Sequence, residues 1–156
     1  MKNRNLNHID DWATPEDFYK NLDDFYHFDF DPCPLGHDIT KWNGLEIEWG
    51  ERNYINPPYS RKLKEAFVIK AIEESKKGKL CVMLLPVSTS TTLFHNYILP
   101  NAQSIEFIRG RIKFRGINTF GDFVTKTAGM HDSMIVVFDT NPYHYRMGQP
   151  YIKINK

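Results

Sequence analysis

The chain lacks the features of secreted and membrane-spanning proteins. It has only two cysteines, Cys33 and Cys81, which form no disulfide pattern, and no positively charged start followed by an apolar run marks a signal peptide. We therefore expect free thiols and a cytoplasmic protein. The longest apolar run, residues 80–87, is far shorter than the roughly 20 residues that cross a bilayer. A membrane-spanning segment is not expected.

A large excess of one charge and internal repetition are also missing. The formal net charge is +1, which excludes a uniformly basic nucleic-acid binder, so any surface for a polyanion must be local. No repeat or low-complexity tract interrupts the 156 residues, of which 41% are hydrophobic, enough for one core. We expect a flexible N-terminal arm over residues 1–10 and a single domain over residues 11–156.

The first half of the chain predicts one helix followed by short strands. Thr14-Pro15-Glu16-Asp17 is typical of a helix start with Thr14 as the N-cap, and apolar residues at helical spacing extend the helix to about Tyr26. Alternation and flanking turn residues then predict extended segments at residues 27–31, 45–49 and 53–55.

The second half predicts a parallel unit followed by antiparallel strands. Helices are expected over residues 61–77 and 91–99, strands over residues 79–85, 104–108, 112–114 and 133–138, and a long polar loop over residues 116–132. The order strand, helix, buried strand implies parallel pairing, whereas later strands without intervening helices imply antiparallel pairing. The expected fold is α/β, with a mixed sheet whose C-terminal edge is antiparallel.

The most specific chemical signal is Asn56-Pro57-Pro58-Tyr59. An adenine amino nitrogen is a poor nucleophile because its lone pair is delocalised into the ring. The Asn56 side-chain oxygen and the Pro57 carbonyl can accept hydrogen bonds from the two N–H groups of this nitrogen and so localise its lone pair. Consecutive prolines hold these acceptors in place, and Tyr59 offers a face on which an extruded base can stack. The alternative is a proline-rich turn with an aromatic plug.

A second candidate is Asp31, which ends the first predicted strand and precedes Pro32 and Cys33. A carboxylate at the C-terminal end of a strand in an open α/β sheet points into the crevice where ligands bind. There it can contact the ammonium group of a methionine moiety. The alternative is a helix or turn cap. No Gly-x-Gly loop accompanies this segment, so glycine spacing does not locate a cofactor pocket.

Cations alternate with glycine and apolar residues between positions 109 and 115. On a strand, this spacing places all the cations on one face and the apolar side chains on the other. Such a face suits a phosphate backbone, and its arginines favour this interpretation over a solvated strand that deters aggregation. The members of this basic row are Arg109, Arg111, Lys113 and Arg115.

Other chemistries have weaker support. Cys33 and His37 have no second ligand pair at a useful spacing, so we expect no metal site. Ser88 and Ser90 lack the glycine-flanked elbow of a hydrolase nucleophile.

Several short motifs follow one another along residues 11–138. They are Trp12-x-Thr14-Pro15, Phe28-Asp29-Phe30-Asp31-Pro32-Cys33, Asn43-Gly44-Leu45 before Trp49, Asn56-Pro57-Pro58-Tyr59-Ser60, Leu84-Leu85-Pro86-Val87, and Gly110-Arg111-Ile112-x-Phe114. In this order they resemble the successive blocks of the phage-type DNA N-6-adenine methyltransferase (Dam-like) family. The chain departs from the family pattern at Asn43, where aspartate is common, and at Pro34, where a small residue is usual.

The resemblance implies a compact Rossmann-like methyltransferase fold, a phage or prophage origin, S-adenosylmethionine as the cofactor and adenine N6 in DNA as the methyl acceptor. The catalytic residues it implies are Asn56, Pro57, Pro58 and Tyr59. The cofactor-binding candidates are Trp12, Thr14, Pro15, Asp31, Pro32, Cys33, Asn43 and Asn56. The candidates for nucleic-acid binding are Ser60, Arg61 and the basic row.

Two other functions remain open at this point. The same pair of acceptors could serve methylation of RNA or of a protein glutamine, and a DNA-binding module could retain the frame without turnover. Transfer of a labelled methyl group to DNA distinguishes the predicted enzyme from both. A monomer and a homodimer both fit the sequence.

Overall fold

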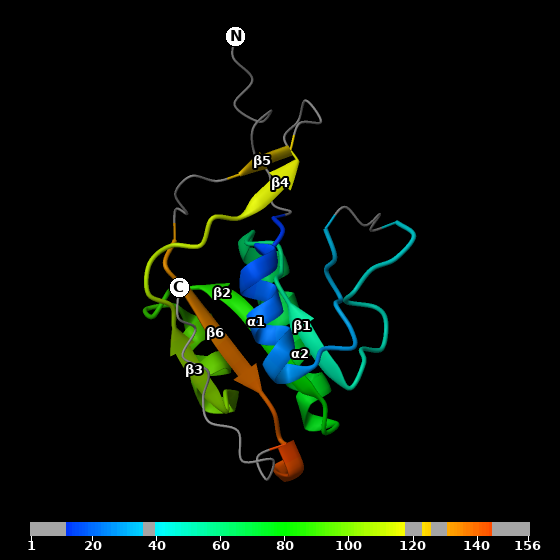
Figure 1. Ribbon diagram of the computed structural model, residues 1–156. Helices are drawn as coiled ribbons and strands as arrows, with labels where there is room; N and C mark the ends of the chain where they lie inside the picture. Colours follow the sequence, from blue (N-terminus) through cyan, green and yellow to red (C-terminus); the bar gives the residue numbers. More distant parts are fainter. Residues whose placement is uncertain (1–11, 36–39, 118–122, 126–130, 145–156) are drawn as a thin grey trace.

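A mixed four-stranded sheet with helices on both faces forms the centre of the structure, and a two-stranded ribbon lies at one end of it (Figure 1). The computed structural model describes residues 12–35, 40–117, 123–125 and 131–144. The helical elements are α1 (Glu16–Tyr26), α2 (Arg61–Lys76), the π-helix η2 (Phe94–Ile98), α3 (Leu99–Asn101) and the 3₁₀ helix η3 (Pro142–His144). The strands are β1 (Arg52–Ile55), β2 (Leu80–Pro86), β3 (Ser104–Phe107), β4 (Arg115–Ile117), β5 (Phe123–Thr125) and β6 (Ser133–Phe138).

The strand order in the main sheet is β1-β2-β6-β3. β1 and β2 are parallel, whereas β6 is antiparallel to both β2 and β3. The C-terminal ends of β1, β2 and β3 therefore lie at the same end of the sheet, which we call the carboxyl end. This arrangement confirms the predicted mixed α/β sheet, but the antiparallel C-terminal strand β6 lies inside the sheet and not at its edge.

Side chains alternate between two hydrophobic clusters, one on each face of the sheet. Ile55, Met83 and Val136 pack under α2 and η2 on one face. On the other face, Tyr54 and Val82 belong to a cluster that α1 and the segment before β4 cover. Because β2 is buried on both faces, its near-continuous apolar sequence is explained, and the predicted buried strand is confirmed.

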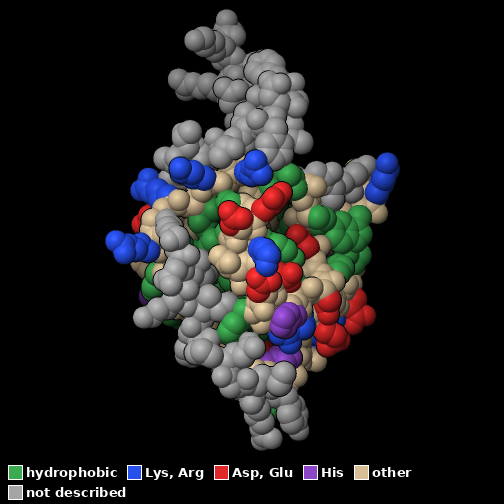
Figure 2. All heavy atoms as spheres, in the orientation of Figure 1, with side chains coloured by type: hydrophobic (Ala, Val, Ile, Leu, Met, Phe, Trp, Pro, Cys, Tyr) green, Lys and Arg blue, Asp and Glu red, His purple; other side chains and the backbone are tan. Residues whose placement is uncertain are grey.

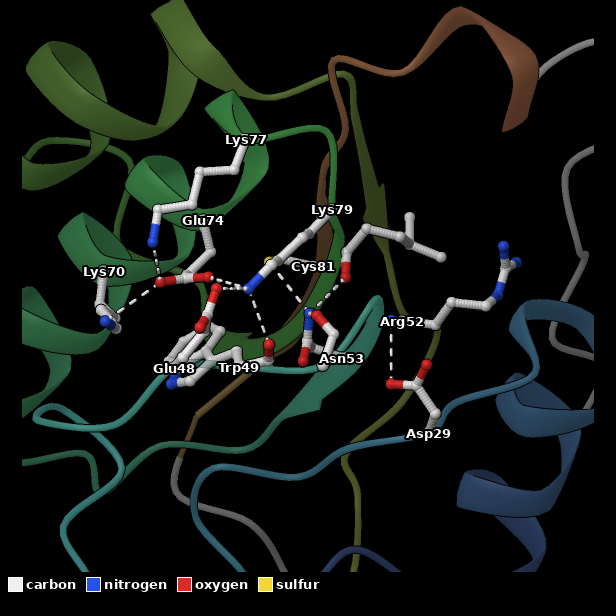
Figure 3. Close-up of polar contacts among 12 residues, drawn as sticks. Asp29, Glu48, Trp49, Arg52, Asn53, Lys70, Glu74, Lys77, Lys79 and Cys81 are labelled. Carbon is white, nitrogen blue, oxygen red and sulfur yellow. Dashed lines mark hydrogen bonds and ion pairs between the residues drawn. The ribbon is translucent and has the colours of Figure 1, made fainter.

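The opposite end of the sheet, which we call the amino end, contains a closed network of charges (Figure 3). The buried carboxylate of Glu74 lies 2.7 Å from Lys79, 3.0 Å from Lys77 and 3.1 Å from Lys70, measured between oxygen and Nζ atoms. Lys79 also donates to the Trp49 carbonyl at 2.7 Å. Although burial opposes ionisation, hydrogen bonds from the three lysines lower the pKa of Glu74 to about 2.

Helix α1 ends at Tyr26 as predicted, but its start differs from the prediction. The N-cap is Pro15, not Thr14, and no side chain caps the helix. The Thr14 hydroxyl instead forms a hydrogen bond with the Tyr54 hydroxyl. Local sequence favoured a capping threonine, but the partner that Thr14 uses comes from a distant strand, which local sequence cannot reveal.

Two predicted strands before β1 are not formed as strands. Residues 45–49 contain a turn and a bend in place of a strand. The Asn43 side chain accepts from the Leu45 amide at 3.0 Å, and the Trp49 indole donates to the Gly44 carbonyl at 2.7 Å. The predicted strand at residues 27–31 is reduced to one parallel bridge between Phe30 and Asn53.

The basic segment and the predicted long loop also differ from expectation. Residues 112–114 pair with no strand among the described residues, although Ile112 and Phe114 are buried as the alternation predicted. Within the predicted loop at residues 116–132, β4 pairs with β5 to form an antiparallel ribbon.

The remaining predictions concern helices, cysteines and the N-terminal arm. α2 occupies Arg61–Lys76, within one residue of its predicted end, and Gly78 follows it with φ +91°. The predicted helix at residues 91–99 is confirmed, with a π-helical turn in it. Cys33 and Cys81 are both buried, and no disulfide joins them. None of the helices in the described ranges is long and apolar enough to span a bilayer. The predicted arm at residues 1–10 lies outside those ranges.

Candidate active site

The Asn56-Pro57-Pro58-Tyr59 loop leaves β1 at the carboxyl end of the sheet and leads into α2. Since β1 pairs in parallel with β2, this is the end at which open α/β sheets bind their ligands. The strand-to-helix context expected from the sequence is therefore confirmed. Pro57 is buried, whereas Asn56 and Tyr59 are half-buried and retain some contact with solvent.

Hydrogen bonds fix the orientation of the Asn56 carboxamide. Its Nδ2 atom donates to the Trp12 carbonyl at 2.6 Å and to the Thr14 hydroxyl at 3.4 Å. A backbone carbonyl can only accept, so the nitrogen must face Trp12 and Oδ1 must face the other way. No donor among the described residues bonds to Oδ1, or to the Pro57 carbonyl. Both predicted acceptors are therefore free of protein donors in this part of the chain.

Tyr54 anchors the threonine that contacts Asn56. Its ring is buried in the β1 face opposite α2, where it meets Tyr19 edge-on at a centroid distance of 5.0 Å. Burial raises the pKa of Tyr54 well above its ordinary value, and the hydrogen bond from Thr14 opposes this only in part. Tyr54 is therefore a neutral phenol.

Tyr59 is held from two sides. Its ring meets Phe114 edge-on at a centroid distance of 6.1 Å, and its hydroxyl donates weakly to the Leu84 carbonyl at 3.4 Å. Burial raises the pKa of Tyr59, so the phenol keeps its proton. These contacts place the ring between the end of β2 and the segment that precedes β4.

Asp31 lies beside β1 and near the tyrosines. The bridge between Phe30 and Asn53 runs parallel to β1, so Asp31 lies level with Tyr54. After burial, the charge of Asp31 is among the causes that raise the pKa of both Tyr19 and Tyr54. Its Oδ1 atom also accepts from the Cys33 amide at 2.8 Å, so the carboxylate caps a turn as well.

The two loops that contain the cofactor-binding candidates pack against each other. A Cβ atom on Gly44 would lie 2.0 Å from the Pro32 carbonyl oxygen, so only glycine allows this approach. The structure thereby brings Asn43 next to the turn of Asp31, Pro32 and Cys33. Trp12 and Thr14 form a second group of candidates beside Asn56, and Pro15 follows them at the start of α1.

The basic row crosses the carboxyl end from β3 to β4. The Ile108 amide donates to Ser133 at 3.0 Å where β3 ends, and an antiparallel bridge joins Arg115 to Ala13 where β4 begins. Arg109, Arg111, Lys113 and Arg115 are all exposed, while the apolar residues between them are buried. Figure 2 shows Lys and Arg side chains gathered toward the upper left of the molecular surface in view. The predicted alternation is therefore present, although only Arg115 belongs to a strand.

Not every cation of this region is equally available. Arg111 lies 3.4 Å from the Asp132 carboxylate, measured from Nε to Oδ1. Ser60 occupies the N-cap position of α2, and the exposed Arg61 pairs with Glu65 one turn along the same helix at 3.3 Å. The structure places Ser60 and Arg61 directly after the Asn56-to-Tyr59 loop.

Sequence reasoning missed Tyr54 and the backbone role of Trp12. Tyr54 lies two positions before Asn56, and side chains at that spacing share one face of a strand, which was the available signal. The part played by the Trp12 carbonyl has no signal in side-chain chemistry. Among the residues that the structure describes, no group of His, Cys, Asp and Glu side chains could hold a metal ion.

Comparison with known proteins gives one match. The family model described as DNA N-6-adenine-methyltransferase (Dam) matches residues 2–151, which is nearly the whole chain. No curated protein and no solved structure matches the chain.

Proposed function

Because this chain belongs to the DNA N-6-adenine-methyltransferase (Dam) family and thus methylates the N6 amino group of adenine in DNA, we propose that residues 56–59 are its catalytic loop. The observation that carries this proposal is the orientation of Asn56. Its two N–H groups are used by Trp12 and Thr14, which leaves Oδ1 as an acceptor at the carboxyl end of the sheet.

The chemistry requires two acceptors around one nitrogen. Asn56 Oδ1 and the Pro57 carbonyl oxygen each accept one N–H of the adenine amino group, which draws the nitrogen lone pair out of the ring. The nitrogen would gain its bond to the methyl carbon as the bond between that carbon and the donor sulfur breaks, and it would stay positive until it releases one proton. Both acceptors bind this positive state more strongly than the neutral amine. The consecutive prolines keep the acceptors fixed before the base arrives, so little reorganisation is needed.

We propose S-adenosylmethionine as the methyl donor, held by the two groups of candidates described above. When bound, it supplies an electrophilic sulfonium methyl group. Asp31 suits the ammonium group of its methionine part because its carboxylate lies beside β1 and carries a negative charge that both Tyr19 and Tyr54 sense. The turn at Asn43 packs against the loop of Pro32 and Cys33 through Gly44. A Rossmann-like fold, with residues 11–156 as one methyltransferase domain, follows from the same proposal.

DNA must reach the loop with its target base outside the helix. Extrusion of a base costs a few kcal/mol of stacking and pairing, which contacts to the base and backbone must offset. Tyr59, held by Phe114 and the Leu84 carbonyl, supplies a stacking partner, and the exposed basic row supplies contacts to phosphates. Ser60 and Arg61 extend this surface toward α2.

The test is methyl transfer from labelled S-adenosylmethionine to adenine-containing duplex DNA, followed by nucleoside analysis. We expect N6-methyladenine from the wild type, and a rate lower by on the order of 10²–10³-fold from Asn56→Ala, since one preorganised partner of the reacting group is lost. Asn96→Ala, at an exposed asparagine of η2, is the matched control and should keep full activity.

Two results would contradict the proposal. Equal rates for wild type and Asn56→Ala would remove Asn56 from the chemistry. Transfer to RNA or to a glutamine peptide, without transfer to DNA, would assign the loop a different acceptor. Circular dichroism of both variants establishes that any loss of rate occurs in folded protein.

A further inference from the structure

We propose that Tyr54 and Thr14 are positioning residues that hold the Asn56 carboxamide in its reactive orientation. This inference rests on the proposed catalytic role of Asn56. The three side chains form a chain of hydrogen bonds, from the buried Tyr54 phenol through the Thr14 hydroxyl to Asn56 Nδ2. Neither Tyr54 nor Thr14 needs to touch the substrate for this role.

A carboxamide needs such support because it can flip about the bond to its side chain. Rotation by half a turn exchanges oxygen and nitrogen in nearly the same space, and the flipped form would point N–H groups at an amine that also donates. The Trp12 carbonyl disfavours the flipped form, but it engages only one of the two N–H bonds. The Thr14 oxygen engages the amide from a second direction, so the plane of the group is fixed as well.

Thr14 can serve as this second partner only while its own side chain is held. It lies before α1 and outside any ladder, and its neighbour Ala13 forms only an isolated bridge with Arg115. The Tyr54 ring, in contrast, belongs to β1, is buried, and packs against Tyr19 and Phe28. The phenol is therefore the rigid end of the chain of hydrogen bonds, and it sets the rotamer of Thr14.

The test compares the variants Tyr54→Phe, Thr14→Val and Thr14→Ser. Tyr54→Phe removes one oxygen and keeps the ring, so the fold is preserved while Thr14 is released. We expect kcat to fall about tenfold in Tyr54→Phe and in Thr14→Val, as for the loss of one hydrogen bond. The KM for DNA should stay unchanged in both variants, and in Tyr54→Phe the affinity for S-adenosylmethionine should stay unchanged as well. Thr14→Ser keeps the hydroxyl and should therefore retain most of the wild-type kcat, unlike Thr14→Val.

Two controls separate positioning from a general effect on structure. Tyr19→Phe makes the same chemical change in the neighbouring ring, whose hydroxyl forms no hydrogen bond with the described residues, and should leave kcat unchanged. If Tyr54 acts only through Thr14, the double variant Tyr54→Phe/Thr14→Val should be no slower than Thr14→Val alone.

The outcomes distinguish this inference from the proposed function. If Asn56→Ala is inactive while Tyr54→Phe and Thr14→Val keep the wild-type kcat, the positioning role is wrong and the catalytic role of Asn56 stands. If Thr14→Val weakens cofactor binding without lowering kcat, Thr14 contacts the cofactor and does not position Asn56. If Asn56→Ala is fully active, the proposed function fails, and the inference fails with it.

Discussion

Asn53 lies in β1 and Asn56 directly follows its last residue, and both use Nδ2 to donate to two acceptors, but their surroundings are opposite. Asn53 Nδ2 donates to the Gly50 carbonyl at 2.9 Å and to the Leu80 carbonyl at 3.0 Å, so it ties the start of β1 to β2. Asn56 Nδ2 donates to Trp12 and Thr14 at the other end of the strand. The Oδ1 atom of neither asparagine has a partner among the described residues, yet Asn53 is fully buried and Asn56 is not.

The difference extends to the two ends of the sheet. At the amino end, the buried Glu74 carboxylate forms ion pairs with Lys70, Lys77 and Lys79 (Figure 3). At the carboxyl end, hydrogen bonds orient Asn56 but leave its acceptor open, and the cations of the basic row are exposed. The same interactions thus stabilise the fold at one end and prepare a site at the other.

Among the variants that separate the two ends of the sheet, Glu74→Gln should have the largest effect on stability. The change removes a buried charge and leaves Lys79, which is only 8% exposed, without its main partner. We expect the free energy of unfolding to fall by about 3–5 kcal/mol, and kcat of the folded enzyme to stay the same. Urea denaturation measures the first and methyl transfer the second. The exposed neighbour provides the control, because Glu73→Gln should change neither.

The contribution of Glu74 to stability should also depend on pH in the acid range. The pKa of Glu74 is lowered to about 2 from an ordinary value of 4.5, so the folded state binds its proton less readily than the unfolded state. The contribution of Glu74 is therefore complete above pH 4.5 and is lost as the pH falls from 4.5 toward 2. The Glu74→Gln variant should lack this part of the acid sensitivity, and an identical profile in both proteins would contradict the assignment.

A smaller effect is expected from Asn53→Ala. The Gly50 and Leu80 carbonyls would lose a donor in a buried setting, which should cost about 1–3 kcal/mol of stability with little change in kcat. Asn56→Ala should show the reverse, a large loss of rate with little loss of stability. If thermal unfolding shows the two alanine variants to be equally destabilised, the contrast between the two asparagines is wrong.

The smallest effect is expected from Lys113→Ala in the basic row. Loss of one phosphate contact should weaken DNA binding to all sequences alike and reduce the slope of log K against log salt by about 1. Stability should not change, because the side chain is exposed. Lys76→Ala, at the end of α2 near the amino end, is the matched control and should leave the salt slope unaltered.

The sequence predicted those parts of the structure that depend on neighbouring residues. Consecutive prolines after an extended segment, the apolar run of β2 and the spacing within α2 each identify an element locally. The alternation at residues 45–49 wrongly indicated a strand. The segment is held by a hydrogen bond from the Trp49 indole to the Gly44 carbonyl, and hydrophobic periodicity does not predict such a contact.

The candidate site was predictable only in part for a similar reason. Asn56, Pro57 and Asp31 have chemistry that can be read from residue type and position in the chain. The use of Thr14 could not be read in this way, because its partners come from β1 and not from the helix that it precedes. Residues far apart in the sequence hold the proposed catalytic loop in place, whereas neighbouring residues determine where it begins.

The bridge between Ala13 and Arg115 has a consequence for how the enzyme is aligned. Its two hydrogen bonds, of 2.6 and 3.0 Å, set the register between the segment that carries Trp12 and the first strand of the ribbon. A slip of one residue would turn Arg115 from solvent toward the protein and move the Trp12 carbonyl by about 3.3 Å along the chain. One pair of backbone hydrogen bonds therefore links the position of a proposed phosphate-binding residue to that of the carbonyl that orients Asn56.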